Sequence, residues 1–270
     1  MPRVLLIFPD EAGGKTMFAL KKRAKTVSGH SFTEEELSAL PRHVGVIMDG
    51  NGRWAKKHKL NVSQGHRAGT EALREIIRHA DAVGIQCLSL YAFSTENKKR
   101  SREEVDALMQ LILDFFDSEI DELHAKNVHI LIMGDKADLP EKQRYTLIEA
   151  EQRTANNTGL NLNIAINYGG KDELVKATRE VALMLKNGQV TLDGIDERLI
   201  ADHLYTAGQP DVDLLIRTSG EMRLSNFMLW QCAYAEFIFP TVLWPDFTVA
   251  DFDDALLAYM RRDRRFGTRL

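Results

Sequence analysis

Short apolar runs alternate with longer amphipathic stretches from residue 43 onward, and this alternation limits the possible folds more than any other feature. The apolar runs cover residues 44–48, 86–93, 128–133, 161–167, 212–217 and 236–243. The amphipathic stretches cover residues 68–83, 103–126, 140–156, 171–187, 196–206 and 250–263. Strands that alternate with helices form a mostly parallel sheet that is covered on both faces. We therefore predict one α/β domain with a mostly parallel six-stranded sheet flanked by helices.

Composition and charge exclude several classes of protein. The 270 residues are 44% hydrophobic and 27% charged, as in ordinary globular domains. A net charge of −4 does not suit a nucleic-acid binder, so we expect no nucleic-acid partner. Cys87 and Cys232 lie among apolar residues, which predicts buried free thiols in a reducing compartment. With no apolar stretch of membrane-spanning length and no signal sequence, a cytoplasmic location is expected.

The chain is expected to consist of an N-terminal extension, residues 1–40, partly flexible, and one domain over residues 41–270. The extension contains Gly13-Gly14-Lys15-Thr16, which resembles the end of a phosphate-binding P-loop. That motif requires a glycine six residues before the lysine, and here Pro9 occupies the position. Because proline fixes φ and lacks an amide donor, a nucleotide-binding protein is the less favoured interpretation. Thr33 and Glu36 predict a capping box for a short helix that Pro41 ends.

The first apolar run leads into the most informative motif of the chain. Residues 44–48 are followed by Asp49-Gly50-Asn51-Gly52, and the residues from Arg53 onward are compatible with a helix. Asp-Gly and Asn-Gly pairs are also typical of β-hairpin turns, but no second alternating strand follows them. A strand, a glycine turn and a helix N-terminus suit a bound phosphate. Arg53 adds a planar cation, and Asp49 adds an oxygen ligand for a hard metal ion.

Polar clusters follow three other predicted strands, at residues 94–97, 168–170 and 217–221. Since the carboxyl ends of parallel strands meet at one crevice, these clusters should converge with the Asp49 turn. Arg217, Arg223 and Ser225 offer two guanidinium groups and a hydroxyl, which suit a second phosphate. The alternative is a pair of ordinary surface arginines. Two phosphate sites would indicate two phosphorylated substrates.

Three further features each allow two interpretations. Glu236 lies among apolar residues, so its carboxylate needs either an ion-pair partner or a metal ion. His66 opens a predicted helix and is either structural or a group that binds phosphate or transfers a proton. The stretch 103–126 is apolar on more than one side, which suits a buried core helix or the wall of an apolar tunnel between sheet and helices. Phosphate sites before such a tunnel would suit a lipid diphosphate.

Several blocks in the same order closely resemble the cis-prenyltransferases, the family of undecaprenyl diphosphate synthase. The resemblance extends from about residue 42 to 267 and rests on residues 43–57, 65–69, 90–97, 163–170, 213–236 and 243–247. It implies repeated cis-condensation of isopentenyl diphosphate onto an allylic diphosphate such as farnesyl diphosphate. It also implies a Mg²⁺-dependent homodimer that makes undecaprenyl diphosphate, the lipid carrier for cell-wall glycans and peptidoglycan. The product would pass into the membrane, with the enzyme either free in the cytoplasm or peripheral at the inner face.

The resemblance also assigns roles to single residues. Asp49 is implied as the essential carboxylate that handles Mg²⁺, joined at the metal by Glu236. Asn97 and His66 are implied as further catalytic residues, although the diphosphate itself is an alternative proton acceptor. The remaining residues are implied to bind the two substrates: Gly50, Asn51, Gly52, Arg53, Trp54, His66, Phe93, Ser94, Thr95, Glu96, Asn97, Lys98, Arg100, Arg217, Arg223, Leu224 and Ser225. The tail at residues 264–267 matches one that reaches across the family's dimer.

The chain departs from the family pattern at two positions. Val62 stands where the family usually has an arginine, and Lys98 stands where it has a tryptophan. We hypothesise that Lys98 partly replaces the missing arginine at the allylic diphosphate. Ala92 and Leu160 match positions along the family's tunnel, and their modest size implies a long product. A regulatory partner subunit is a non-enzymatic alternative, but such partners typically lack the Asp49–Arg53 motif.

Overall fold

The structure is a computed structural model that describes residues 6–9, 15–18 and 29–262. Its centre is a six-stranded sheet in the order β5-β6-β4-β3-β7-β8, and every pair of neighbouring strands is parallel. The strands are β3 (His43–Ile47), β4 (Cys87–Ser94), β5 (His129–Met133), β6 (Asn161–Tyr168), β7 (Leu214–Arg217) and β8 (Glu236–Ile238). The predicted fold class and single domain are confirmed.

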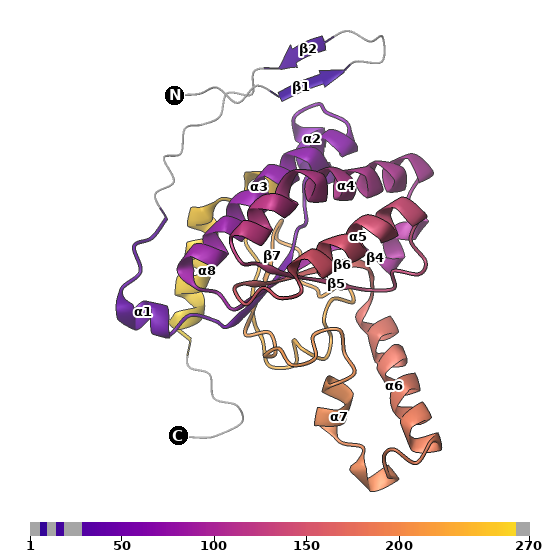
Figure 1. Ribbon diagram of the computed structural model, residues 1–270. Coiled ribbons are helices and arrows are strands. Elements are labelled where there is room, and N and C mark those ends of the chain that lie inside the picture. The colour runs from indigo at the N-terminus through magenta and orange to yellow at the C-terminus, as the bar shows by residue number, and fades with distance from the viewer. Residues whose placement is uncertain (1–5, 10–14, 19–28, 263–270) are drawn as a thin grey trace.

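Helices cover mainly one face of this sheet. Figure 1 shows α3, α4, α5 and α8 together on one side of the sheet, with α6 and α7 on the other. The helices are α1 (Glu34–Ser38), α2 (Asn51–Lys57), α3 (Val62–Val83), α4 (Arg102–Ala125), α5 (Glu141–Thr154), α6 (Gly170–Lys186), α7 (Glu197–Ala201) and α8 (Val249–Met260). Short 3-10 helices cover Thr95–Lys99, Leu192–Gly194 and Trp244–Asp246. The larger core lies between the sheet and α3, α4, α5 and α8.

The second face of the sheet is covered largely by irregular segments. Val212, Phe227, Met228 and Cys232 pack there against strand residues such as Leu215. The predicted strand 236–243 ends at Ile238 because the next residues bond to a loop instead of to β7. Here the carbonyls of residues 240 and 242 accept the amides of residues 220 and 219. The predicted helix 196–206 similarly ends at residue 201, and turns follow it.

The N-terminal residues give only limited structural information. The strand β1 (Leu6–Pro9) pairs with β2 (Lys15–Phe18) in an antiparallel hairpin, so Lys15 and Thr16 belong to a strand and not to the start of a helix. Gly13 and Gly14 lie outside the described residues, as do most of the predicted flexible extension and the tail at 264–267. The predicted capping box of Thr33 and Glu36 is present at α1.

Two other sequence expectations can be compared with the described residues. Cys87 and Cys232 are both buried and free, and burial raises the pKa of their thiols to about 11 and about 12. Both thiols therefore stay protonated at neutral pH. None of the helices in residues 29–262 combines the length and apolar character that a bilayer crossing requires.

A buried polar chain connects three neighbouring strands below the site. The ring of His43 is fully buried; its Nδ1 lies 2.7 Å from the carbonyl of Pro210, and its Nε2 lies 2.7 Å from Ser89 Oγ. Asn163 Nδ2 donates to the same hydroxyl oxygen at 2.9 Å. Since a carbonyl can only accept, Nδ1 carries the hydrogen and Nε2 accepts from Ser89. The network therefore fits a neutral imidazole, and burial lowers the pKa of His43.

This network predicts a loss of stability in mild acid. Because the folded protein lowers the pKa of His43, the unfolded chain binds a proton more readily, and stability falls as the pH drops below about 6.5 towards the folded pKa. His43→Gln cannot titrate, so its free energy of unfolding should depend less on pH, by up to about 1.4 kcal/mol per pH unit. Urea unfolding between pH 7.5 and 5.5 measures both slopes. Equal slopes would contradict the assignment.

Candidate active site

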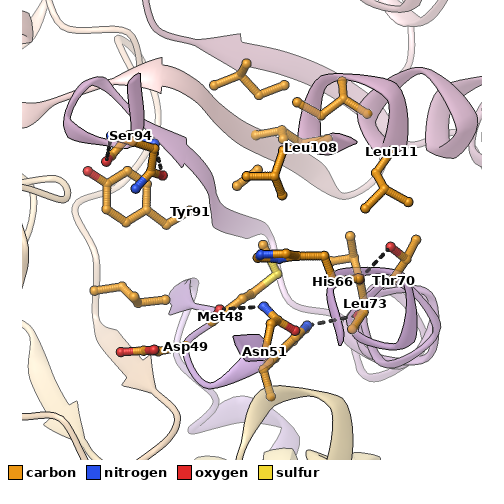
Figure 2. A pocket seen from close by; sticks show the side chains of 18 of the residues that line it. Met48, Asp49, Asn51, His66, Thr70, Leu73, Tyr91, Ser94, Leu108 and Leu111 are labelled. Carbon is orange, nitrogen blue, oxygen red and sulfur yellow. Dashed lines mark hydrogen bonds between the residues drawn. The ribbon is translucent and has the colours of Figure 1, made fainter. Parts of the chain in front are cut away.

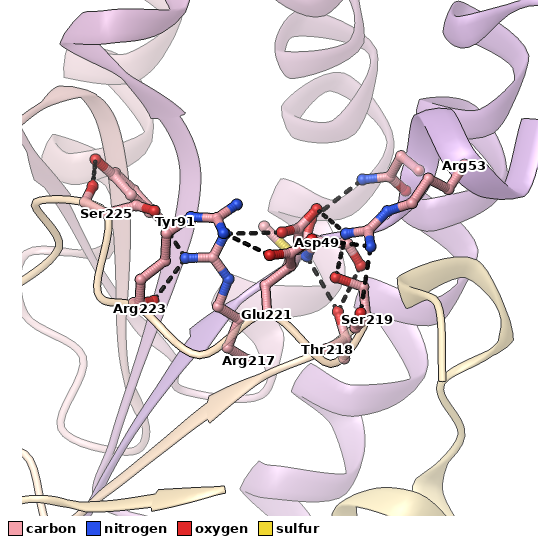
Figure 3. A network of polar contacts seen from close by, with 11 residues as sticks. Asp49, Arg53, Tyr91, Arg217, Thr218, Ser219, Glu221, Arg223 and Ser225 are labelled. Atoms are coloured by element: carbon pink, nitrogen blue, oxygen red, sulfur yellow. Dashed lines mark hydrogen bonds and ion pairs between the residues drawn. The ribbon is translucent and has the colours of Figure 1, made fainter. Parts of the chain in front are cut away.

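The ends of β3 and β7 bring two distant motifs together. These strands are parallel neighbours, and Ile47 is in register with Arg217. Asp49 follows two residues later, where Arg217 Nη2 donates to its Oδ2 at 2.8 Å. Figure 3 shows Asp49 between the guanidinium groups of Arg217 and Arg53. The prediction that the Asp49 turn and the Arg217 cluster share one crevice is therefore confirmed.

The turn after β3 requires glycine at its first position. Gly50 adopts φ +112°, in the left-handed region that favours glycine, and α2 begins at the next residue. A Cβ at Gly50 would lie 3.0 Å from the side chain of Leu243, so the close approach also favours glycine. The expected strand, glycine turn and helix are present. The first N–H groups of such a helix have no partner within it.

Two arginines determine the charge state of Asp49. Arg53 Nη2 donates to Oδ1 at 3.1 Å, while Arg217 donates to Oδ2. Burial raises the pKa of Asp49, but the hydrogen bonds and charges of Arg217 and Arg53 outweigh it, so the pKa lies below its ordinary value. The backbone is held as well, because Thr218 Oγ1 accepts from the Asp49 amide at 3.0 Å and donates to its carbonyl at 2.6 Å. Asp49 is thus a fixed carboxylate at neutral pH.

Arg217 is the most buried cation of the site, with 4% of its surface exposed. Its Nη1 donates to Ser225 Oγ at 2.7 Å and to the carbonyl of Arg223 at 2.6 Å. Its Nε is buried without a hydrogen-bond partner. One guanidinium therefore binds Asp49 on one side and the Arg223–Ser225 segment on the other. The interpretation of Arg217 as an ordinary surface arginine is wrong.

Glu221 is a part of the site to which the sequence assigned no role. Its carboxylate accepts from Arg53 Nη1 at 3.1 Å and also pairs with Arg223. The hydrogen bond and charge of Arg223, followed by the charge of Arg53, lower the pKa of Glu221, so the carboxylate stays ionised. In the sequence, the position of Glu221 between Arg217 and Arg223 was the feature that could have indicated its contact with an arginine.

A pocket of about 700 Å³ opens at this mouth and continues between the sheet and two helices. Figure 2 shows Leu108 and Leu111 of α4 across from His66 and Leu73 of α3. The polar lining residues include Asp49, Asn51, His66, Ser94, Glu96, Asn97, Arg100, Arg217, Arg223 and Ser225. The apolar lining residues include Ile47, Met48, Leu73, Ala92, Leu108, Leu111, Ile112, Phe115, Phe116, Ile164 and Ile166. The helix predicted at 103–126 therefore both packs in the core and lines a pocket.

The rim of the pocket holds a histidine that is neutral at pH 7. His66 Nε2 lies 3.8 Å from Glu104 Oε1, which Arg100 Nη1 also contacts at 2.8 Å. Burial, followed by the positive charge of Arg100, lowers the pKa of His66. Asn97 is fixed nearby because its Oδ1 accepts from the Ser94 amide at 2.9 Å.

Several residues that the resemblance implied do not line the pocket: Gly50, Gly52, Arg53, Trp54, Phe93, Thr95, Lys98, Leu224 and Glu236. Arg53 still reaches Asp49, as described above. Trp54 is buried, and its indole donates to Asp246 Oδ1 at 3.0 Å. Phe93 is part of the core. Lys98 pairs with Asp138 on the surface, so the structure does not place it as a substitute for the missing arginine.

The resemblance placed both Ala92 and Leu160 along the tunnel, but only one of them lines the pocket. Ala92 lines the pocket, whereas Leu160 is a buried core residue outside its lining.

Within one chain, Glu236 does not lie at the same end of the sheet as Asp49. It is the first residue of β8 and is in register with Leu214, three residues before Arg217. Because the strands are parallel, Glu236 lies towards the end of the sheet opposite the mouth, and it pairs with Arg262 at 2.5 Å. Residues 6–9, 15–18 and 29–262 contain no group of three or more His, Cys, Asp or Glu side chains that could hold a metal. One chain therefore does not form the implied Asp49–Glu236 pair, and the ion-pair alternative is the one present.

The site predicts a specific need for arginine at position 217. Arg217→Lys keeps the charge but loses the two-sided fork, so it should weaken binding of inorganic diphosphate by about tenfold or more. Isothermal titration calorimetry measures this affinity, and Arg179→Lys, on the exposed face of α6, is the matched control. Equal affinity in both variants would contradict the role of Arg217.

The chain is similar to a set of known enzymes. The family model described as "Putative undecaprenyl diphosphate synthase" matches residues 47–267. An isoprenyl transferase of Clostridium perfringens is 48% identical over 228 residues, which cover 84% of this chain and 90% of that protein.

Two solved structures share the fold. Lavandulyl diphosphate synthase from Lavandula x intermedia, in complex with dimethylallyl diphosphate, has a TM-score of 0.83 and 40% identity, and the match covers 86% of this chain and all of that one (100%). A "probable undecaprenyl diphosphate synthase" from Campylobacter jejuni has a TM-score of 0.71 and 30% identity over 84% of this chain and 99% of that one. With the shared mouth and the pocket behind it, these matches show that the chain belongs to the undecaprenyl diphosphate synthase family and is a cis-prenyltransferase.

Proposed function

We propose that this enzyme extends farnesyl diphosphate by repeated cis addition of isopentenyl diphosphate and makes undecaprenyl diphosphate. The observation that carries the proposal is the contact between Arg217 Nη2 and Asp49 Oδ2, at 2.8 Å. It lies at the mouth of a pocket of about 700 Å³ with an apolar interior. Charged groups at the mouth suit diphosphates, and the apolar wall suits a growing hydrocarbon chain. Residues 41–270 would form the catalytic unit.

The allylic diphosphate would bind at the start of α2. Gly50, Asn51 and Gly52 bring the backbone of the turn close to the mouth, and Arg53 supplies a guanidinium beside Asp49. From there the pocket leads past Ala92 and Leu108, which gives the prenyl chain an apolar path. The leaving diphosphate would thus stay among cations and amides while its charge increases.

Isopentenyl diphosphate would bind to Arg217, Arg223 and Ser225. Arg217 already holds Ser225 and the Arg223 backbone, so this segment is ordered before any ligand binds. Isopentenyl diphosphate would displace Glu221 from Arg223, and the allylic diphosphate would displace it from Arg53. Glu221 then acts as a charge-balancing group for the free enzyme.

The residues of the mouth also fit a bound magnesium ion. Mg²⁺ is usually held by one or two carboxylates together with substrate phosphates and water, and not by a cage of protein ligands alone. Asp49 provides one ionised carboxylate beside the proposed diphosphates, which satisfies this pattern. When bound, the ion would neutralise charge that develops on the leaving diphosphate. That Glu236 binds the same magnesium ion together with Asp49 stays a prediction.

Removal of the final proton needs an acceptor near the reacting carbons. His66 lines the pocket. Because its pKa is lowered, its imidazole is neutral at pH 7 and can accept a proton. The Oδ1 of Asn97 already accepts from Ser94, so its amide group is positioned to orient a substrate and not to act as a base. The diphosphate itself is the other acceptor.

We further propose a homodimer in the cytoplasm that delivers its lipid product to the inner face of the membrane, for use as a carrier of cell-wall glycans. The support is the edge strand β8, the last of the six-stranded sheet, together with Tyr234 just before it, which is 73% exposed. Edge strands and exposed aromatic side chains are typical of surfaces that bind another chain. Light scattering of the purified protein measures the oligomeric state directly.

The decisive assay supplies farnesyl diphosphate, radiolabelled isopentenyl diphosphate and Mg²⁺, and separates the products by chromatography. The proposal expects one long polyprenyl product that disappears when the metal is chelated. In a parallel reaction with dimethylallyl diphosphate as the only substrate, formation of lavandulyl diphosphate would instead match the activity in the name of the lavender enzyme. The absence of any product would contradict the proposed substrates.

The wall of the pocket predicts control of chain length. Ala92 lies on β4 and lines the apolar part, so Ala92→Leu should block the growing chain and shorten the product by several isoprene units. Leu160→Met is the control, because Leu160 is buried outside the lining. Chromatography of the products compares the two variants. An unchanged length in Ala92→Leu would mean that the chain grows along another path.

A further inference from the structure

The segment that carries Arg223 and Ser225 has an unusual backbone. Ser225, Asn226 and Met228 adopt φ values of +49°, +66° and +44°, in the left-handed region that non-glycine residues rarely occupy. Such conformations persist only where surrounding contacts hold them, and they concentrate at functional sites. Asn226 lines the pocket, yet nothing above assigns it a role.

Asn226 uses two oxygens to bind the start of α6. Its carbonyl accepts from the Gly170 amide at 2.7 Å, and its Oδ1 accepts from the Lys171 amide at 2.9 Å. The N-cap of α6, Gly169, has no side chain that could satisfy these amides, so Asn226 caps the helix from a distant part of the chain. A Cβ at Gly169 would lie 2.7 Å from Asn226 Nδ2, so the glycine leaves room for this contact.

The remaining polar group of Asn226 reaches the opposite wall of the mouth. Its Nδ2 donates to Glu96 Oε1 at 2.9 Å, and Glu96 belongs to the same 3-10 turn as Asn97. The neighbouring carbonyl of Ser225 accepts from the Tyr91 hydroxyl at 3.1 Å. The two hydrogen bonds of the Asn226 side chain thus join the Arg223–Ser225 segment to the start of α6 and to Glu96 in the lining of the pocket.

We propose that Asn226 is a positioning residue that fixes the isopentenyl diphosphate site relative to the turn containing Asn97. Asparagine suits this position because it tolerates the left-handed backbone and offers one acceptor and one donor at once. Aspartate would keep the acceptor for Lys171 but would face Glu96 with a second carboxylate. This inference rests on the proposed function, since it names the substrate whose placement Asn226 controls.

The chain contains a matched control for a purely structural role. Asn127 also has a left-handed backbone, with φ +61°, and its side chain likewise makes two bonds, to the amide and the hydroxyl of Thr158 at 3.0 Å each. Its carbonyl accepts from Gly159, as that of Asn226 accepts from Gly170. Asn127 lies just before β5 and therefore near the end of the sheet away from the mouth. The two asparagines differ mainly in what they connect.

Asn226→Ala and Asn127→Ala should therefore be compared in stability and in kinetics. Both should lower the urea midpoint, but only Asn226→Ala should raise KM for isopentenyl diphosphate, by about tenfold or more, with a smaller change for the allylic substrate. Equal effects of the two variants on KM, or an unchanged KM in Asn226→Ala, would overturn the proposal.

A second pair of variants tests the contact with Glu96 itself. Asn226→Asp should raise KM for isopentenyl diphosphate strongly when it is compared with the wild type. In a Glu96→Gln background the same substitution should raise KM by about threefold or less relative to Glu96→Gln alone, because the glutamine amide donates to the new carboxylate. Multiplicative effects, with no rescue, would contradict a direct coupling.

Failure of the proposed function would be recognised separately. If wild-type protein did not bind isopentenyl diphosphate in calorimetry, the substrate assignment would fall, whatever Asn226 does. Hydrogen exchange would still report on the positioning role: Asn226→Ala should accelerate exchange in residues 219–228 and 94–100, whereas Asn127→Ala should not. Unchanged exchange in both segments would overturn that role.

Discussion

The site depends on one buried guanidinium. A buried charge is costly unless it is paired and hydrogen-bonded, and Arg217 meets this requirement by binding Asp49 on one side and the Arg223–Ser225 segment on the other. The parallel pairing of β3 with β7 makes the contact possible, because it places Ile47 level with Arg217. Two motifs 168 residues apart thereby form one mouth.

The contacts around Arg217 also explain how the free enzyme holds several arginines close together. Arg53 and Arg223 share the carboxylate of Glu221, and Arg53 and Arg217 share that of Asp49. In the proposed function a diphosphate would replace Glu221 at Arg223 and Arg53, while Asp49 would keep its contact with Arg217. The arginines would then be oriented for the leaving group before it departs.

Much of this arrangement was predictable from sequence, because strand ends in a parallel sheet must converge and because apolar periodicity marks helices and strands. The Asp49 turn, the Arg217 cluster and the apolar helix at 103–126 were found in this way. The patterns could not show partners that depend on tertiary packing. The sequence left Glu236 open between an ion pair and a metal ion, and its position at the start of β8 gives it Arg262 as a partner. Lys98 likewise pairs with Asp138. The strand predicted to residue 243 stops at 238 because its continuation binds a loop.

The most direct test of the account is a crystal structure with a non-reactive thio analogue of farnesyl diphosphate and with isopentenyl diphosphate. The account predicts one diphosphate beside Arg53 at the start of α2, the other on Arg217 and Arg223, and the prenyl chain along Ala92 and Leu108. A prenyl chain outside this pocket, or two diphosphates on separate faces of the molecule, would contradict it.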